Sequence, residues 1–178
     1  MFYAYHVVTD RPMTLGQYIR FDETHHSGVY QRVMERLPQV EEIYRDPARF
    51  AGVTLDHHLD VALRELALED VRRENYPQYP SRMSCLYVSQ TLGESEDWFA
   101  YFTSLGRPTY QIVKLKIDGR VFLGDAAKCF DGTPDREENR RLAARYWENR
   151  SVPDERQIVE MLVDGDIEVV EILRDIRK

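Results

Sequence analysis

Apolar residues fall in short blocks along the chain, and the spacing inside each block predicts a strand or a helix. Blocks rich in aromatic and β-branched residues predict strands. They cover residues 2–9, 16–19, 84–88, 110–117, 121–123, 158–163 and 167–173. Asp118-Gly119 is a tight-turn signal, so residues 121–123 are expected to form the returning strand. Asp164-Gly165 joins the last two strands.

In other blocks, apolar residues recur at intervals of three and four positions, and this spacing predicts helices. One stripe runs from Val29 to Leu37 and is expected to end at Pro38, and a longer one spans residues 59–71. Thr91 with Glu94 forms a capping box that opens a third helix. Thr133 as cap, with Pro134 at the first helical position, begins a fourth. Because strands and helices do not alternate regularly, the pattern predicts an α+β fold rather than a doubly wound parallel sheet.

Composition is that of a globular chain, with 43% hydrophobic and 31% charged residues over 178 positions, which suggests a single domain over residues 1–178. No apolar run reaches the roughly 18 residues of a membrane span. The first residues read as a strand rather than a signal peptide, and Cys85 and Cys129 are expected to be free thiols. A cytoplasmic protein without membrane partners is therefore expected. The formal charge of −7 argues against a protein that coats duplex nucleic acid.

Several common sites are excluded by their motifs. Neither a Gly-x-Gly-x-x-Gly fingerprint nor a P-loop is present, so any use of NAD must rest on another architecture. His25-His26 and His57-His58 are adjacent pairs, and neighbouring helical side chains point about 100° apart, so each pair offers one metal ligand at best. There is no His-Glu-x-x-His or Cys-x-x-Cys. No metal site is expected, and these histidines are interpreted as solvated helix positions.

Three side chains stand out against their surroundings. His6 lies in an apolar strand, where a hydrogen-bonded core histidine is the alternative to a functional one. Trp98 is equally compatible with simple core packing. Glu160 interrupts the apolar 158–163 block, on the same strand face as Ile158 and Leu162. A carboxylate there costs free energy unless it is paired or lines a wet cleft, so Glu160 is a candidate functional residue.

Three ordered blocks of the chain resemble the ADP-ribosyltransferase superfamily. The first is Phe-Tyr-Ala-Tyr-His-Val-Val-Thr at 2–9, followed by 13–19; the second is 81–89 with the helix through Trp98; the third is 157–167 around Glu160. The likeness is to small bacterial branches: rifampin-modifying transferases, DNA-modifying toxins of toxin–antitoxin pairs, and an uncharacterised bacterial domain family. It implies a split mixed or antiparallel sheet with flanking helices. Residues 21–80 match nothing in these blocks and are interpreted as a helical insertion for substrate recognition.

The resemblance implies NAD as co-substrate and a role for each matching residue. His6 would hold a ribose, and the backbone of Val7 would grip the nicotinamide amide. Tyr87 would line the pocket, and Trp98, 11 positions later, would take the place of a tyrosine that stacks on nicotinamide. Arg82 and Ser84 are also expected to bind NAD, with Arg82 at the pyrophosphate.

Two residues compete for the catalytic acid under this resemblance. Glu160 falls on the family's late-strand glutamate. Residues 119–125 resemble the segment in which the rifampin-modifying branch carries an aspartate, which makes Asp125 the rival.

The implied function is an NAD-dependent ADP-ribosyltransferase that cleaves the nicotinamide–ribose bond. The acceptor is left open between protein, nucleic acid and small molecule, and a toxin or phage-defence effector with its own antitoxin is one expectation. The alternative is a non-catalytic, nucleotide-binding or protein-docking module of the same fold, because Trp98 replaces a tyrosine and no threonine directly adjoins His6. An RNA 2′-phosphotransferase-like activity is disfavoured by the acidic balance.

Overall fold

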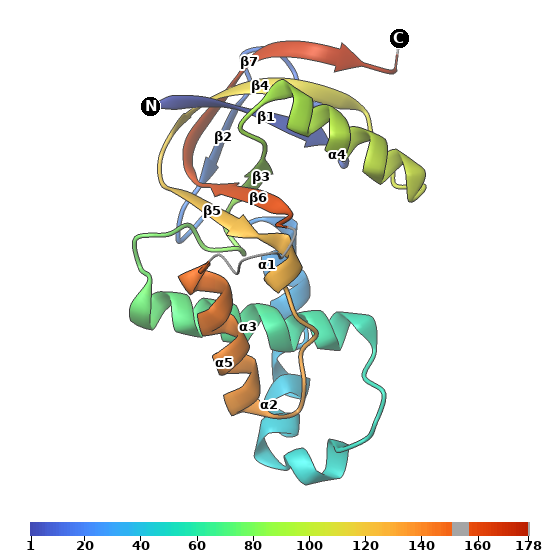
Figure 1. Cartoon of the computed structure of the whole chain (residues 1–178), viewed down its shortest axis with the longest axis vertical. Coiled ribbons are helices and arrows are strands. Elements are labelled where there is room, and N and C mark those ends of the chain that lie inside the picture. Colours follow the sequence, from blue (N-terminus) through green and yellow to red (C-terminus); the bar gives the residue numbers. More distant parts are fainter. Residues whose placement is uncertain (151–156, 178) are drawn as a thin grey trace.

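Seven strands form two antiparallel sheets in a computed structural model that describes residues 1–150 and 157–177 (Figure 1). The four-stranded sheet has the order β1 (Phe2–Val8), β4 (Gln111–Asp118), β7 (Gly165–Asp175), β2 (Tyr18–Phe21). The three-stranded sheet has the order β3 (Leu86–Val88), β6 (Val159–Val163), β5 (Val121–Asp125). Five α-helices and two 3₁₀ helices complete the described chain. The predicted α+β class is confirmed.

The main apolar core lies between the two sheets. Val113 and Leu115 of β4 and Val169 of β7 are fully buried against Met161 and Val163 of β6. The opposite face of the three-stranded sheet is also covered, because Leu162 packs with apolar residues of the helices below. Both faces of β6 are therefore buried over Met161–Val163, which explains why these residues are all apolar rather than alternating with polar ones.

Both Asp-Gly junctions carry the chain from one sheet to the other. β5 was expected to return beside β4, but β4 pairs with β1 and β7, whereas β5 pairs with β6. β6 and β7 separate in the same way. The two junctions lie against each other: a Cβ on Gly119 would lie 1.9 Å from the Asp164 carbonyl oxygen, and one on Gly165 would lie 2.3 Å from that of Asp118. Glycine is required there because two backbones touch where the sheets diverge.

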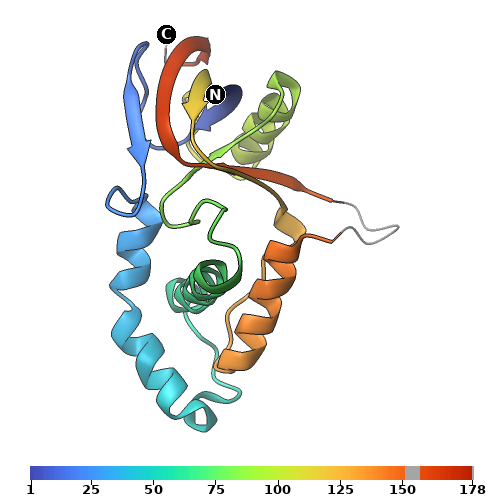
Figure 2. The same ribbon diagram turned by 90° about the vertical axis from the view of Figure 1, so that its left-hand side faces the viewer.

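Four helices form a layer beneath the three-stranded sheet, and three of them lie within residues 21–80, the segment predicted as an insertion. α3 (His57–Asn75) runs through the centre, with α1 (Gly28–Met34) and α2 (Leu37–Arg45) on one side and α5 (Arg136–Glu148) on the other (Figure 2). The short helix η1 (Pro47–Phe50) follows α2. The fifth helix, α4 (Leu92–Ser104), lies apart from this layer and packs on β1 and β4 (Figure 1). Among the described residues, no helix is both long enough and apolar enough to cross a bilayer.

Local start and stop signals were only partly predictable. The capping box at Thr91 and Glu94 is confirmed. Pro38 was expected to end a helix, but α1 ends at Met34 and Pro38 lies in the first turn of α2, where its missing N–H costs nothing. The cap of α5 is Asp135 and not Thr133. The strand predicted over 84–88 begins only at Leu86, and that predicted over 16–19 begins only at Tyr18.

Candidate functional site

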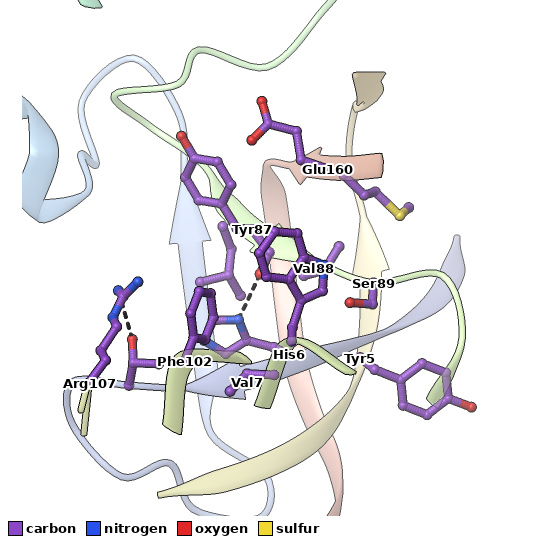
Figure 3. Close-up of a pocket in the computed structure, with 13 residues that line it drawn as sticks. Tyr5, His6, Val7, Tyr87, Val88, Ser89, Phe102, Arg107 and Glu160 are labelled. Carbon is purple, nitrogen blue, oxygen red and sulfur yellow. Dashed lines mark hydrogen bonds between the residues drawn. The ribbon is translucent and has the colours of Figure 1, made fainter. Parts of the chain in front are cut away.

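A cavity of about 340 Å³ opens where the edge strand β1 meets β3 (Figure 3). The two strands are joined there by Tyr5 and Ser89, whose backbone groups exchange hydrogen bonds of 2.9 and 2.7 Å. The volume lies at the lower end of the range for ligand pockets. We call it the His6 pocket. Five predicted residues from four elements line it: His6, Val7, Tyr87, Trp98 and Glu160.

His6 is held as a neutral imidazole with a defined tautomer. Its Nδ1 lies 2.7 Å from the carbonyl oxygen of Tyr87, which can only accept, so Nδ1 carries the proton (Figure 3). Burial lowers the pKa of His6 to about 4, and the positive charge of Arg107 acts in the same direction, while the bond to Tyr87 opposes them. The ring therefore keeps Nε2 as a hydrogen-bond acceptor at neutral pH.

Val7 presents free backbone groups to the pocket. In an antiparallel ladder, successive residues direct their N–H and C=O groups to alternate sides. Tyr5 bonds outward to Ser89, whereas Val8 accepts from Tyr110 on the β4 side. The amide groups of Val7 therefore point outward, as those of Tyr5 do, and no residue of the described chain pairs with them on that side. An edge strand with one free donor and one free acceptor can bind a primary amide.

Aromatic rings form much of the remaining wall. Trp98 and Phe102 lie one helical turn apart on α4, with ring centroids 5.3 Å apart. Tyr87 extends from β3 towards the level of the Glu160 carboxylate (Figure 3). Rings of this kind offer flat faces for stacking a heterocycle.

The Glu160 carboxylate is fixed by two donors that act on one oxygen. Arg82 Nη1 donates to Oε1 at 2.7 Å, and the Tyr146 hydroxyl makes a very short bond to the same atom. The Glu160 side chain is 12% exposed. No hydrogen bond from the described residues reaches Oε2. One carboxylate oxygen is therefore anchored and the other is available to a ligand.

Arg82 connects Glu160 to the helical layer. Its guanidinium donates to Glu65 of α3, with Nε 3.0 Å from Oε2, and to the Tyr146 hydroxyl at 2.7 Å. Burial alone would raise the pKa of Glu65, but the charges of Arg82 and Arg64 hold it below the ordinary value. Burial opposes the charge on Arg82 as well, yet Glu65 and the other acceptors raise its pKa above the usual range. Glu65 and Arg82 therefore keep their charges, and Arg82 is shared between the carboxylates of Glu65 and Glu160.

Comparison with known proteins assigns the family. A family described as "Protein of unknown function (DUF2441)" matches residues 4–175. The chain belongs to the DUF2441 family. No curated protein matches it.

Three predicted site residues of this DUF2441 protein lie outside the lining of the His6 pocket. Asp125 is 3% exposed, and its Oδ1 accepts from the backbone N–H groups of Ala127 and Ile158, both at 3.0 Å, so it caps the short helix η2 (Ala126–Lys128). Ser84 is buried beside His26, with 2.6 Å between Oγ and Nδ1. Arg82 contacts Glu160 but lines a different cavity.

Three residues that the sequence patterns did not identify belong to the site. Arg107 lines the His6 pocket and donates to the Thr9 hydroxyl at 3.1 Å (Figure 3), whereas in the sequence it only marks a helix end. Glu65 and Tyr146 hold Arg82 and Glu160. Glu65 carried a usable signal, since it lies three residues after Ala62 and so falls on the buried face of α3. Within the described residues, no group of three or more His, Cys, Asp or Glu side chains could hold a metal ion.

Proposed function

We propose that this protein is an ADP-ribosyltransferase that binds NAD in the His6 pocket and cleaves its nicotinamide–ribose bond. One observation carries the proposal. His6 and Glu160 lie at opposite ends of the sequence, yet both line one pocket together with Tyr87 and Trp98. Composition and local motifs do not single out these four residues together. They were expected as a set only from the resemblance to the superfamily.

The chemistry of the pocket suits the nicotinamide group. Its carboxamide has one C=O and one NH₂, which match the outward N–H and C=O of Val7. The Trp98 ring offers a face for the pyridinium, and a positively charged ring is attracted to an aromatic face. A purely apolar ligand would leave the backbone groups of Val7 without partners.

Glu160 supplies the negative charge that bond cleavage needs. The ribose develops oxocarbenium character as nicotinamide leaves, as in glycoside hydrolysis. A carboxylate fixed in advance by Arg82 and Tyr146 stabilises that charge without reorganising. Its free Oε2 can accept a hydrogen bond from a ribose hydroxyl.

His6 and Arg107 would position the rest of the donor. The neutral His6 ring accepts through Nε2, so it suits a ribose hydroxyl. Arg107 lies at the rim of the same pocket, and a guanidinium matches a diphosphate. The pyrophosphate role expected of Arg82 therefore passes to Arg107 in this proposal, because Arg82 is committed to Glu65 and Glu160.

The overall reaction is balanced without an added oxidant or metal. The bond between ribose C1′ and the nicotinamide nitrogen breaks, and its electron pair stays on nicotinamide, which leaves neutral. A nucleophilic group of the acceptor forms the new bond to C1′ and loses its proton. Water would serve as acceptor in a slow hydrolytic side reaction.

Two measurements on the purified chain test this function. Calorimetric titration with NAD should give saturable binding, and chromatography should detect nicotinamide when NAD is incubated with the chain and a bacterial lysate. The absence of both would reject the proposal.

Binding without nicotinamide release would instead favour the non-catalytic, nucleotide-binding module. One observation supports that second candidate: Glu160 is already paired with Arg82, which lowers the negative charge that it offers to a substrate.

A further inference from the structure

A second cavity of about 240 Å³ lies on the helical side of Tyr87. We call it the Arg32 pocket. Tyr87 lines both cavities, and the rest of the wall comes from α1, α3 and Arg82. Five of its residues matter here: Arg32, Arg64, Glu65, Arg82 and Tyr87.

The lining of the Arg32 pocket carries excess positive charge. Three guanidinium groups face a single carboxylate, that of Glu65. Arg82 and Arg64 both donate to Glu65, with the Nε of each within 3.1 Å of a carboxylate oxygen. Arg32 makes no hydrogen bond or ion pair with any residue that the structure describes. This concentration of cations occurs in a chain whose formal charge is −7.

The Arg32 pocket is one hydrogen bond away from the proposed catalytic carboxylate. Arg82 lines it and donates to Glu160 at 2.7 Å, and the Arg82 guanidinium lies 5.5 Å from the centre of the Tyr87 ring. A ligand anchored among the arginines can therefore extend past Tyr87 towards the edge of the His6 pocket.

We propose that the Arg32 pocket binds a phosphate group of the acceptor, which makes the acceptor a nucleotide or a nucleic-acid strand. The inference rests on the proposed function, because it places this phosphate beside an NAD-cleaving site. Arg82 is committed to Glu65 and Glu160. The groups left for a ligand are therefore the unpaired guanidinium of Arg32 and Nη2 of Arg64, which makes no hydrogen bond with the described residues. Guanidinium groups match the accepting oxygens of a phosphate ester. The diphosphate of NAD already has Arg107 in the His6 pocket, which leaves the second cluster for the other substrate. The positive charge of this cluster can attract a phosphate even though the chain as a whole is acidic.

Calorimetric titration of the full chain tests the inference independently of turnover. The probes are a single-stranded DNA tetranucleotide, a 5′-mononucleotide and NAD, each at low and at moderate salt. Arg32→Gln is the main variant, because its side chain is exposed and its loss leaves no carboxylate unpaired. Arg64→Gln is the second variant. Arg45→Gln is the matched control, since it removes the same charge from the neighbouring helix α2 at a position outside both pockets.

The expected result is a rise of about tenfold in the dissociation constant of a phosphate-bearing probe for Arg32→Gln, with a shallower salt dependence. Arg45→Gln should bind as the unmodified chain does, and NAD affinity should change less than twofold. A loss for the tetranucleotide alone identifies a strand as acceptor, and a loss for both probes identifies a single phosphate as sufficient. Equal binding by the Arg32, Arg64 and Arg45 variants overturns the inference. So does a loss confined to NAD, which would assign the pocket to the donor. Neither result depends on nicotinamide release, so the proposed function can stand or fail separately.

Discussion

Replacing Tyr146 with phenylalanine removes one oxygen atom from the centre of the Glu160 cluster. The Tyr146 ring is fully buried, and its hydroxyl donates to Glu160 Oε1 while it accepts from Arg82 Nη1 at 2.7 Å. Burial raises the pKa of Tyr146 well above its usual range, so the hydroxyl stays protonated and keeps donating. Phenylalanine has the same shape, so the apolar packing of α5 against β5 survives.

The expected cost follows from the bonds that remain. A hydrogen bond to a charged group contributes about 1.5–3 kcal/mol. Arg82 and Glu160 stay bonded to each other at 2.7 Å in the variant, so neither is left without a partner. We therefore expect a loss near the value of one such bond, about 1.5–3 kcal/mol. For a domain of this size, each kcal/mol lowers Tm by about 2–4 °C, so the fall in Tm should be roughly 3–12 °C.

Urea denaturation and a thermal scan measure this change, and a double-mutant cycle with Glu160→Gln assigns it. If the hydroxyl acts through Glu160, the effect of Tyr146→Phe should shrink in the Glu160→Gln background. Nicotinamide release per folded molecule should also fall in Tyr146→Phe, because the carboxylate loses one of its two anchors. Equal stability and equal turnover of Tyr146→Phe and the unmodified chain would refute the reasoning.

Three further predictions concern His6, Trp98 and Asp125. The folded pKa of His6 is lowered to about 4 from an ordinary value of 6.5, so the unfolded chain binds more protons between these values and the free energy of unfolding falls as pH decreases. Between pH 7 and pH 5 the free energy of unfolding should fall by about 1–2 kcal/mol. Urea titration measures this fall, and the same dependence on pH in His6→Gln would contradict the prediction. Trp98→Ala should raise the dissociation constant of NAD about tenfold or more, whereas Trp98→Phe keeps an aromatic face and should stay within about threefold of the unmodified chain. Calorimetric titration measures both constants, and equal values for the two variants would argue against stacking on Trp98. Asp125→Ala should cost about 1–2 kcal/mol through lost capping of η2, with nicotinamide release per folded molecule unchanged, and a catalytic defect there would restore Asp125 as the acid.

Two residues of the candidate site stand out in the sequence because they conflict with their local surroundings, whereas Val7, Tyr87 and Trp98 were expected only from the resemblance. His6 and Glu160 are polar side chains inside apolar strands, and such exceptions are visible in a single sequence. Burial and partners could not be predicted. Glu160 reaches Arg82 and Tyr146 because α3 and α5 pack beneath the three-stranded sheet, and this packing is not visible in the sequence.

The Asp-Gly junctions show why the pairing of strands was predicted incorrectly. Asp118-Gly119 has the local chemistry of a hairpin turn, and local chemistry cannot tell a strand that returns from one that changes sheet. The decisive contact is between two distant segments, Gly119 against Asp164, reinforced by Arg120, whose Nη2 lies 2.6 Å from an Asp164 carboxylate oxygen. Arg107 was overlooked for a similar reason, because its position beside a proline suggests only a helix end.

The most direct test of the central claim is the rate of nicotinamide release from NAD by Glu160→Gln, compared with Glu171→Gln as an exposed carboxylate control on β7. If the Glu160 charge stabilises the developing ribose cation, the rate should fall on the order of 10²-fold or more, while NAD affinity changes little and Glu171→Gln retains full activity. A Glu160→Gln protein that releases nicotinamide as fast as the control would show that the bond is not broken at this carboxylate.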